Sequence, residues 1–269
     1  MRIIQMSQEL YASMDSRVSR RNFTAPPHQG QLAELRAYAD ELNAEAGGTI
    51  RFGIWEDGAE EVFGGLSNSY GMFKGVKAFM AFIGRMEGNP KQVKTLAGYY
   101  GEQLVLKANR MGLGTCWVAG TFDKAMAKRV AGVEEPEQLL CVCPVGETPE
   151  SLSLREKLLK GFSTTRRRKP LEDIVRNADR FVEAPGWMRS ALEAARIAPS
   201  ALNAQPWRFH LQPEEQAIQV TVEGRASKEP VDLGIAMAHL EIAALAAGKR
   251  GTWTEEGESW TFRVTGEAL

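Results

Sequence analysis

The 269-residue sequence contains no apolar run long enough to span a lipid bilayer. Its first residues lead directly into polar positions and not into the apolar region of a signal peptide. Acidic and basic residues nearly balance, and the net charge of −1 gives no reason to expect nucleic acid or an anionic membrane as a partner. We therefore expect a cytoplasmic protein that binds neither a membrane nor nucleic acid.

Cysteine and histidine are scarce, with three of each. So few cysteines suit a reducing compartment and not a disulfide framework. Cys141 and Cys143 alternate within the strand-like run Leu139–Val145, which places both on one face as small core residues. No spacing of Cys and His matches a zinc site, so the sequence predicts no metal.

Helix and strand patterns follow one another along the whole chain. Helices are predicted over Leu32–Ala46, Lys94–Met111, Phe122–Val130, Trp187–Ile197 and Val231–Ala247, and strands over Thr49–Trp55, Val76–Ile83, Leu139–Val145, Trp207–Leu211, Ile218–Val222, around Trp253 and over Trp260–Val264. The order helix–strand–strand–helix–strand occurs twice, although a mixed order could also arise without duplication. We predict an α+β fold made of two similar halves, residues 1–170 and 171–269.

Two basic segments are candidate anion sites. In residues 17–23, Arg-Val-Ser-Arg-Arg-Asn-Phe, alternate positions carry Arg, Ser and Arg, which can converge on one phosphate group. Residues 166–170, Arg-Arg-Arg-Lys-Pro, can complete the same site from an extended chain. Each segment taken alone is also consistent with a solvated basic surface or an exposed hinge.

Residues 112–120, Gly-Leu-Gly-Thr-Cys-Trp-Val-Ala-Gly, form a third candidate segment. Its glycines let the backbone approach something flat, and Trp117 is placed to pack beside an aromatic ligand. A helix end followed by a buried strand is the alternative. The glycine-rich segment Gly64–Gly75 also has two interpretations. It is either a mobile wall over a ligand or an ordinary loop between strands.

The fourth segment, residues 199–207, is a loop in which two prolines fix the backbone. Between them Ser200, Asn203 and Gln205 carry donors and acceptors suited to a heterocycle edge and a polyol chain. A capped, Asn-containing turn would explain the same residues without a ligand.

Together the four segments resemble the flavin-dependent nitroreductase family. Members typically read Arg-Arg-Ser-x-Arg-x-Phe, Pro-Ser-x-x-Asn-x-Gln-Pro-Trp and Gly-Leu-Gly-Thr-x-Trp, and they close with a basic pair before Pro-Leu-Glu. This chain matches them at 17–23, 199–207, 112–117 and 166–172. Here the Pro-Ser loop follows the closing basic pair, whereas in ordinary members it comes soon after the first motif. Each half thus holds motifs that the other lacks, as in the tandem, pseudodimeric group of this family.

The resemblance implies a nitroreductase-like fold in which one chain mimics the family's homodimer, with one FMN between the halves. The FMN phosphate would be held by Arg17, Ser19, Arg166 and Arg168. Arg21 would lie nearer the pyrimidine edge or the ribityl chain. There its guanidinium would stabilise the negative charge that develops at the flavin N1 and C2 carbonyl.

The isoalloxazine contacts would come from both halves. Val118, Ala119 and Gly120 would run past the flavin N5 with a backbone N–H available to it, where many members have Glu-Gly in place of Ala119-Gly120. The second half would contribute the side chains of its loop to the isoalloxazine and ribityl groups: Pro199, Ser200, Asn203 and Gln205.

The implied activity is ping-pong transfer of hydride from NADH or NADPH through the flavin to a nitroarene, quinone or enone acceptor. The flavin carries this chemistry, so we expect no catalytic side chain, and we expect a monomer because the family interface lies inside the chain. Three alternatives stay open: an FMN-binding sensor or carrier without turnover, another flavin reaction such as reductive dehalogenation or flavin breakdown, and a structural protein without cofactor.

Overall fold

The computed structural model describes residues 1–3, 7–64, 73–151, 168–223 and 229–268. Arg166 and most of the glycine-rich segment Gly64–Gly75 lie outside this part of the chain. Within it, no helix combines the length and the apolar character needed to cross a membrane.

The described residues form two successive groups of helices and strands. The first group contains α1 (Ser7–Ser16), α2 (Gln29–Glu45), β1 (Ile50–Trp55), α3 (Ala59–Gly64), β2 (Phe79–Arg85), α4 (Pro90–Arg110), β3 (Gly114–Thr115), α5 (Lys124–Val130) and β4 (Glu137–Gly146). The second contains α7 (Leu171–Ile174), α8 (Gly186–Arg196), β5 (Trp207–Gln212), β6 (Ala217–Val222), α9 (Glu229–Ala246), β7 (Lys249–Glu256) and β8 (Ser259–Glu267).

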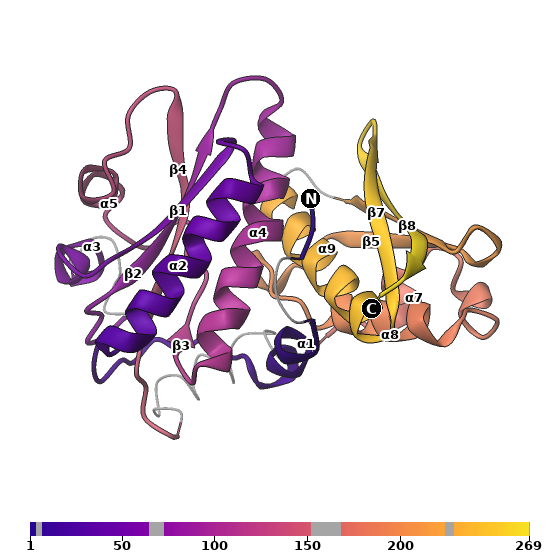
Figure 1. Ribbon diagram of the computed structural model, residues 1–269, viewed down its shortest axis with the longest axis horizontal. Helices are drawn as coiled ribbons and strands as arrows, with labels where there is room; N and C mark the ends of the chain where they lie inside the picture. The colour runs from indigo at the N-terminus through magenta and orange to yellow at the C-terminus, as the bar shows by residue number, and fades with distance from the viewer. Residues whose placement is uncertain (4–6, 65–72, 152–167, 224–228, 269) are drawn as a thin grey trace.

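Each group builds a four-stranded antiparallel sheet, and the two sheets have the same strand order. That order is β1-β2-β4-β3 in the first sheet and β5-β6-β8-β7 in the second. The sheets lie on opposite sides of the molecule, with α4 and α9 between them (Figure 1). The separation of Gly98 from Gly234 in the sequence equals that of Trp117 from Trp253. The predicted α+β fold with internal duplication is therefore confirmed.

The ends of α2 show how local chemistry sets the helix boundaries. His28 Nδ1 accepts a hydrogen bond from the backbone N–H of Gln31 at 3.4 Å, and Gln31 Oε1 accepts one from the backbone N–H of His28 at 3.2 Å. This reciprocal cap starts the helix before the predicted Leu32. Gly47 and Gly48, with φ of 59° and 80°, end it in the left-handed conformation.

The cysteines lie in the core, as predicted. Cys141 and Cys143 pack on one side of β4 in the larger hydrophobic cluster, while Val142 between them packs into a second cluster. Burial raises the pKa of both thiols, so they stay protonated at neutral pH. No group of three or more potential metal ligands occurs among the described residues.

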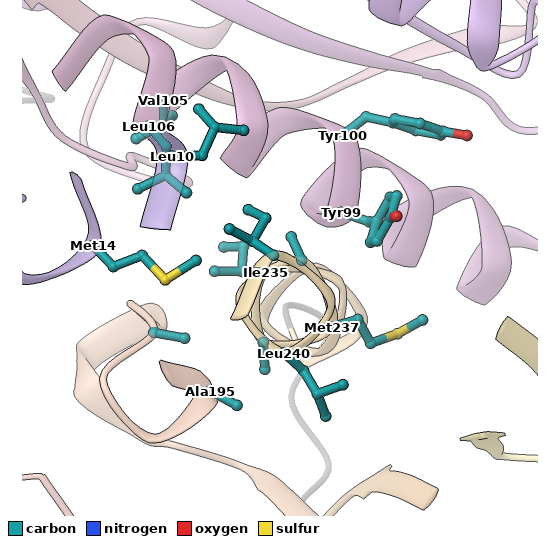
Figure 2. Close-up of a cluster of buried hydrophobic side chains, with 14 of the residues drawn as sticks. Leu10, Met14, Tyr99, Tyr100, Val105, Leu106, Ala195, Ile235, Met237 and Leu240 are labelled. Atoms are coloured by element: carbon teal, nitrogen blue, oxygen red, sulfur yellow. The ribbon is translucent and has the colours of Figure 1, made fainter. Parts of the chain in front are cut away.

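Helices α4 and α9 cross with their backbones in contact. A Cβ atom placed on Gly98 would lie 2.0 Å from the backbone O of Val231, and one on Gly234 would lie 1.9 Å from the backbone O of Thr95. Only glycine permits this approach. Figure 2 shows α9 end on, with Ile235 among side chains from α4 and α1, and with Ala195 of α8 nearby. The crossing joins the two halves and fixes the position of every polar group that α9 presents to α4.

One of these polar groups is the carboxyl of Glu241, whose side chain is 4% exposed. Its Oε2 accepts hydrogen bonds from Tyr99 Oη at 2.6 Å and from Trp253 Nε1 at 2.7 Å. Burial raises the pKa of Glu241 from 4.5 to about 7, although the two hydrogen bonds oppose this change.

The raised pKa predicts a pH-dependent stability. Between pH 4.5 and 7 folded Glu241 keeps a proton that the unfolded chain has released, so this group makes the free energy of unfolding fall as pH rises through that window, by on the order of 3 kcal/mol. In Glu241→Gln the amide oxygen can still accept both hydrogen bonds, but the side chain no longer titrates. The difference in the free energy of unfolding between pH 5 and pH 8 should therefore shrink by about the same amount. Urea unfolding at both pH values measures it. Glu61→Gln, at an exposed position, should behave as wild type, and parallel curves for Glu241→Gln and wild type would contradict the assignment.

Candidate functional site

Arg17 follows the last turn of α1, where its backbone N–H donates to the Ser13 carbonyl at 3.0 Å. Its side chain is 6% exposed and places Nε 3.8 Å from Oε1 of Glu102, a residue of α4. Its Nη1 is buried and has no hydrogen-bond partner in the described part of the chain. A buried, charged donor without a partner is costly unless something else binds it, so Arg17 marks a candidate anion site.

The segment after Arg17 lies beside β3. Ser19 forms a parallel bridge with Thr115, and the N–H of Arg20 donates to the Thr115 carbonyl at 2.8 Å. Thr115 Oγ1 is a second buried polar atom with no partner among the described residues. A Cβ on Gly114 would lie 3.0 Å from the side chain of Arg20 and 2.3 Å from that of Thr148, which explains the glycine. Two of the predicted segments therefore meet here.

Residues 117–120 continue from this contact. The N–H and the carbonyl of Val118 are both bonded to Val142 at 2.9 Å, so a ligand beside this segment would have to use the N–H of Ala119 or Gly120. Trp117 was expected beside an aromatic ligand, yet its ring stacks on Phe82, with centroids 4.5 Å apart. Its Nε1 donates to Glu102 Oε2 at 2.7 Å, which anchors the segment to α4.

Arg168 comes just before the second half and is bonded to the end of α8 and to the loop that follows that helix. Its Nη1 donates to the Ala198 carbonyl at 2.9 Å and to Asn203 Oδ1 at 2.8 Å, and its Nη2 donates to the Ile197 carbonyl at 2.7 Å. Burial, together with the positive charges of Arg17 and Arg196, lowers the pKa of Arg168 to about 10. Arg168 is therefore within electrostatic range of Arg17, although the two residues are far apart in the sequence.

The loop after α8 is held in an unusual backbone conformation. Leu202, Asn203 and Gln205 have φ of 53°, 55° and 48°, a region that non-glycine residues seldom adopt. Ser200 Oγ accepts from the N–H of Gln205 at 2.9 Å, and Gln205 Oε1 accepts from the N–H of Lys169 at 2.8 Å. Strain of this kind persists where the surrounding structure enforces it, which is common at ligand sites.

A scan against family models matches residues 9–244 to the family described as "Putative TM nitroreductase". The chain belongs to this nitroreductase family. A solved structure of a nitroreductase of the same group from Thermotoga maritima has 20% sequence identity and a TM-score of 0.63, with 98% of this chain and 97% of that chain covered.

Shorter members of the nitroreductase fold match part of the chain. A nitroreductase family protein from Streptococcus pneumoniae has 16% identity and a TM-score of 0.47, covering 62% of this chain and 99% of that one. An FMN-dependent nitroreductase from Clostridium difficile has 16% identity and a TM-score of 0.40, covering 52% and 87%. A search of curated proteins gives no match.

In this nitroreductase-family chain, the predicted site residues come from two separate groups of contacts. Arg17 and Ser19 come from the first half, together with the segment that contains Val118, Ala119 and Gly120. The second half brings the loop with Pro199, Ser200, Asn203 and Gln205, to which Arg168 is bonded. Arg21 lies in the same segment, residues 17–23, as Arg17. Its backbone carbonyl accepts a hydrogen bond from the N–H of Lys74 at 2.9 Å.

Two buried residues next to Arg17 and Trp117 had not been predicted from the sequence, Glu102 of α4 and its neighbour His239 of α9. Both are 0% exposed, and His239 Nε2 lies 3.0 Å from Glu102 Oε1. His239 Nδ1 lies 2.9 Å from the Ala194 carbonyl of α8. The available signal was an ionisable residue among apolar neighbours in each helix, because such residues are rarely buried without a partner.

Proposed function

We propose that this protein binds one FMN where its two halves meet and acts as an NAD(P)H-dependent oxidoreductase. The observation that carries the proposal is the buried Nη1 of Arg17, which has no hydrogen-bond partner among the described residues, together with Oγ1 of Thr115 on the neighbouring strand, which has none there either. A phosphate group offers acceptors to both atoms and negative charge to the guanidinium. The residues present therefore fit the phosphate end of FMN.

The chain's residues divide the binding between the two halves. Arg17, Ser19 and Arg168 would bind the phosphate, because they bring two cations and a hydroxyl to one region. Arg166 would join them from the segment that precedes Arg168.

The remaining contacts would hold the ring system. The loop side chains of Ser200, Asn203 and Gln205 would contact the ring and ribityl group, in a backbone already fixed by internal hydrogen bonds. Ala119 or Gly120 would donate a backbone N–H at the ring edge. Pro199 is buried and shapes the loop, and Arg21 would stabilise charge at the pyrimidine edge.

When bound, the flavin supplies hydride transfer from NADH or NADPH to a nitroaromatic, quinone or enone acceptor. The protein's part is to bind and orient it in a region where Glu102 and His239 are buried from water. No protein nucleophile is needed. The unusual backbone at Leu202, Asn203 and Gln205 supports this proposal, because a pre-formed loop avoids an ordering cost on binding.

A second, symmetry-related flavin site is not proposed. The duplication places Trp253 where the first half has Trp117, and beside it lies a surface cavity of about 370 Å³. Its described lining offers the carboxylates of Glu45 and Glu255 and no Lys or Arg. The second half also lacks the Arg-Ser-Arg motif that the first half carries at residues 17–21. One FMN per chain is therefore expected.

The test is to titrate the purified chain with FMN and then to add NADH or NADPH without oxygen. We expect uptake of one FMN per chain and bleaching of its visible bands on addition of nicotinamide. Bound FMN that stays oxidised would support a sensor or carrier in place of an oxidoreductase. Failure to bind FMN at all would overturn the proposal.

A further inference from the structure

The contact between Glu102 and His239 has no assigned part in the proposed binding of FMN. It joins α4 of the first half to α9 of the second, and both side chains are 0% exposed. Glu102 accepts a hydrogen bond from Trp117 Nε1 at 2.7 Å through its other oxygen, and Arg17 Nε lies 3.8 Å from Oε1. A buried acid is therefore placed directly beside the proposed phosphate-binding arginine.

Hydrogen-bond chemistry fixes the net charge of the pair. The Ala194 carbonyl can only accept, so His239 Nδ1 at 2.9 Å must carry a hydrogen. His239 Nε2 and Glu102 Oε1, 3.0 Å apart, would both be acceptors without a further proton. One proton must therefore lie between them. Whether it rests on nitrogen or on oxygen, the pair has no net charge.

This neutrality matters for Arg17. At 3.8 Å its Nε is beyond hydrogen-bond distance from Glu102, and its Nη1 has no partner among the described residues. Without the histidine, the carboxylate of Glu102 would carry its full negative charge 3.8 Å from Nε of Arg17 and would offset the positive charge of that guanidinium.

We propose that His239 is a positioning residue that neutralises Glu102, so that Arg17 keeps its positive charge and its free Nη1 for the phosphate dianion of the cofactor. His239 reaches the ligand only through Glu102 and Arg17. This inference rests on the proposed FMN site. On this inference, tight binding of FMN requires that His239 of the second half neutralise Glu102 of the first half.

The test measures the affinity of the purified chain for FMN and for riboflavin, which lacks the phosphate, by quenching of flavin fluorescence. The dissociation constant for riboflavin divided by that for FMN measures how much the phosphate contributes to binding. His239→Gln leaves Glu102 ionised beside Arg17, and we expect the ratio to fall about tenfold. Glu102→Gln removes the acid itself and should keep the wild-type ratio. The double variant Glu102→Gln/His239→Gln should restore it.

A purely structural role predicts a different pattern. If the pair only held the helices together, each single variant would weaken FMN and riboflavin alike, and the double variant would be the weakest. Either that pattern or an unchanged ratio in His239→Gln would overturn the inference. Should His239→Gln fail to fold, Glu102→Gln decides, because a tenfold loss of its ratio would contradict the proposal. Failure of the proposed function would be visible separately, as equal affinity of the wild-type chain for FMN and riboflavin.

Discussion

Gly234→Ala is expected to destabilise the fold by about 3 kcal/mol or more, at the upper end of the cost of overpacking. The new Cβ would lie 1.9 Å from the Thr95 carbonyl oxygen and 2.6 Å from the Tyr99 nitrogen. Both are backbone atoms, so no side-chain rotation can relieve the contact and α9 must move away from α4. That movement would also separate His239 from Glu102, so FMN binding should weaken in parallel.

Gly30→Ala is the matched control, because Gly30 also lies in a helix. Its nearest atom to a new Cβ would be His28 Nδ1 at 3.6 Å, an ordinary contact. Alanine there should leave stability unchanged or raise it by up to about 1 kcal/mol. Urea unfolding followed by tryptophan fluorescence compares the two variants. If Gly234→Ala unfolded at the same urea concentration as wild type, the close crossing of α4 and α9 would be wrong.

Periodicity in the sequence was sufficient to locate most of the secondary structure. The predicted helices and strands each overlap an element of the fold, because burial of one face imposes its spacing on the residues. Helices α1, α3 and α7 were not predicted, and the strand β3 was predicted only as one of two alternatives for residues 112–120. Strand β3 is defined by its pairing with β4, which no local pattern reveals.

The sequence revealed the duplication as a repeated order of helices and strands. The contacts between the two repeats could be identified only from the three-dimensional structure. The glycines at the crossing, Gly98 and Gly234, occupy corresponding positions because each helix needs a residue without a side chain where the backbones touch. Trp117 and Trp253 also correspond, and each donates its Nε1 to a buried glutamate of the preceding central helix. Those acids, Glu102 and Glu241, do not occupy corresponding positions, so no sequence repeat could reveal them.

Motifs identified candidate ligand residues but not their partners. Motif matching selected Arg17 and Arg168 from segments far apart in the chain, and the fold brings their charges together. It could not select Glu102, whose role depends on a histidine in the other half. Side chains that act through other side chains carry no local motif, because their positions are set by the packing of helices.

Arg17→Leu is expected to reduce the affinity for FMN by about two orders of magnitude and to leave that for riboflavin almost unchanged. The estimate follows from the roughly 1.5–3 kcal/mol that a hydrogen bond to a charged group contributes, together with the loss of a buried cation. Arg17→Lys should recover part of the loss, since it keeps the charge but not the planar fork. Fluorescence titration with both flavins measures the effect.

Arg110→Leu provides the control for charge alone. Arg110 ends α4 with its side chain 55% exposed and lies 3.9 Å from Glu9, so it should leave both affinities as in wild type. Arg17 differs from Arg110 because its Nη1 is buried, so only the loss of Arg17 should affect the binding of the phosphate. An equal loss of FMN and riboflavin affinity in Arg17→Leu would mean that Arg17 supports the fold and not the phosphate. Unchanged affinities for both flavins would mean that Arg17 does not bind the phosphate, which would then lie elsewhere on the chain.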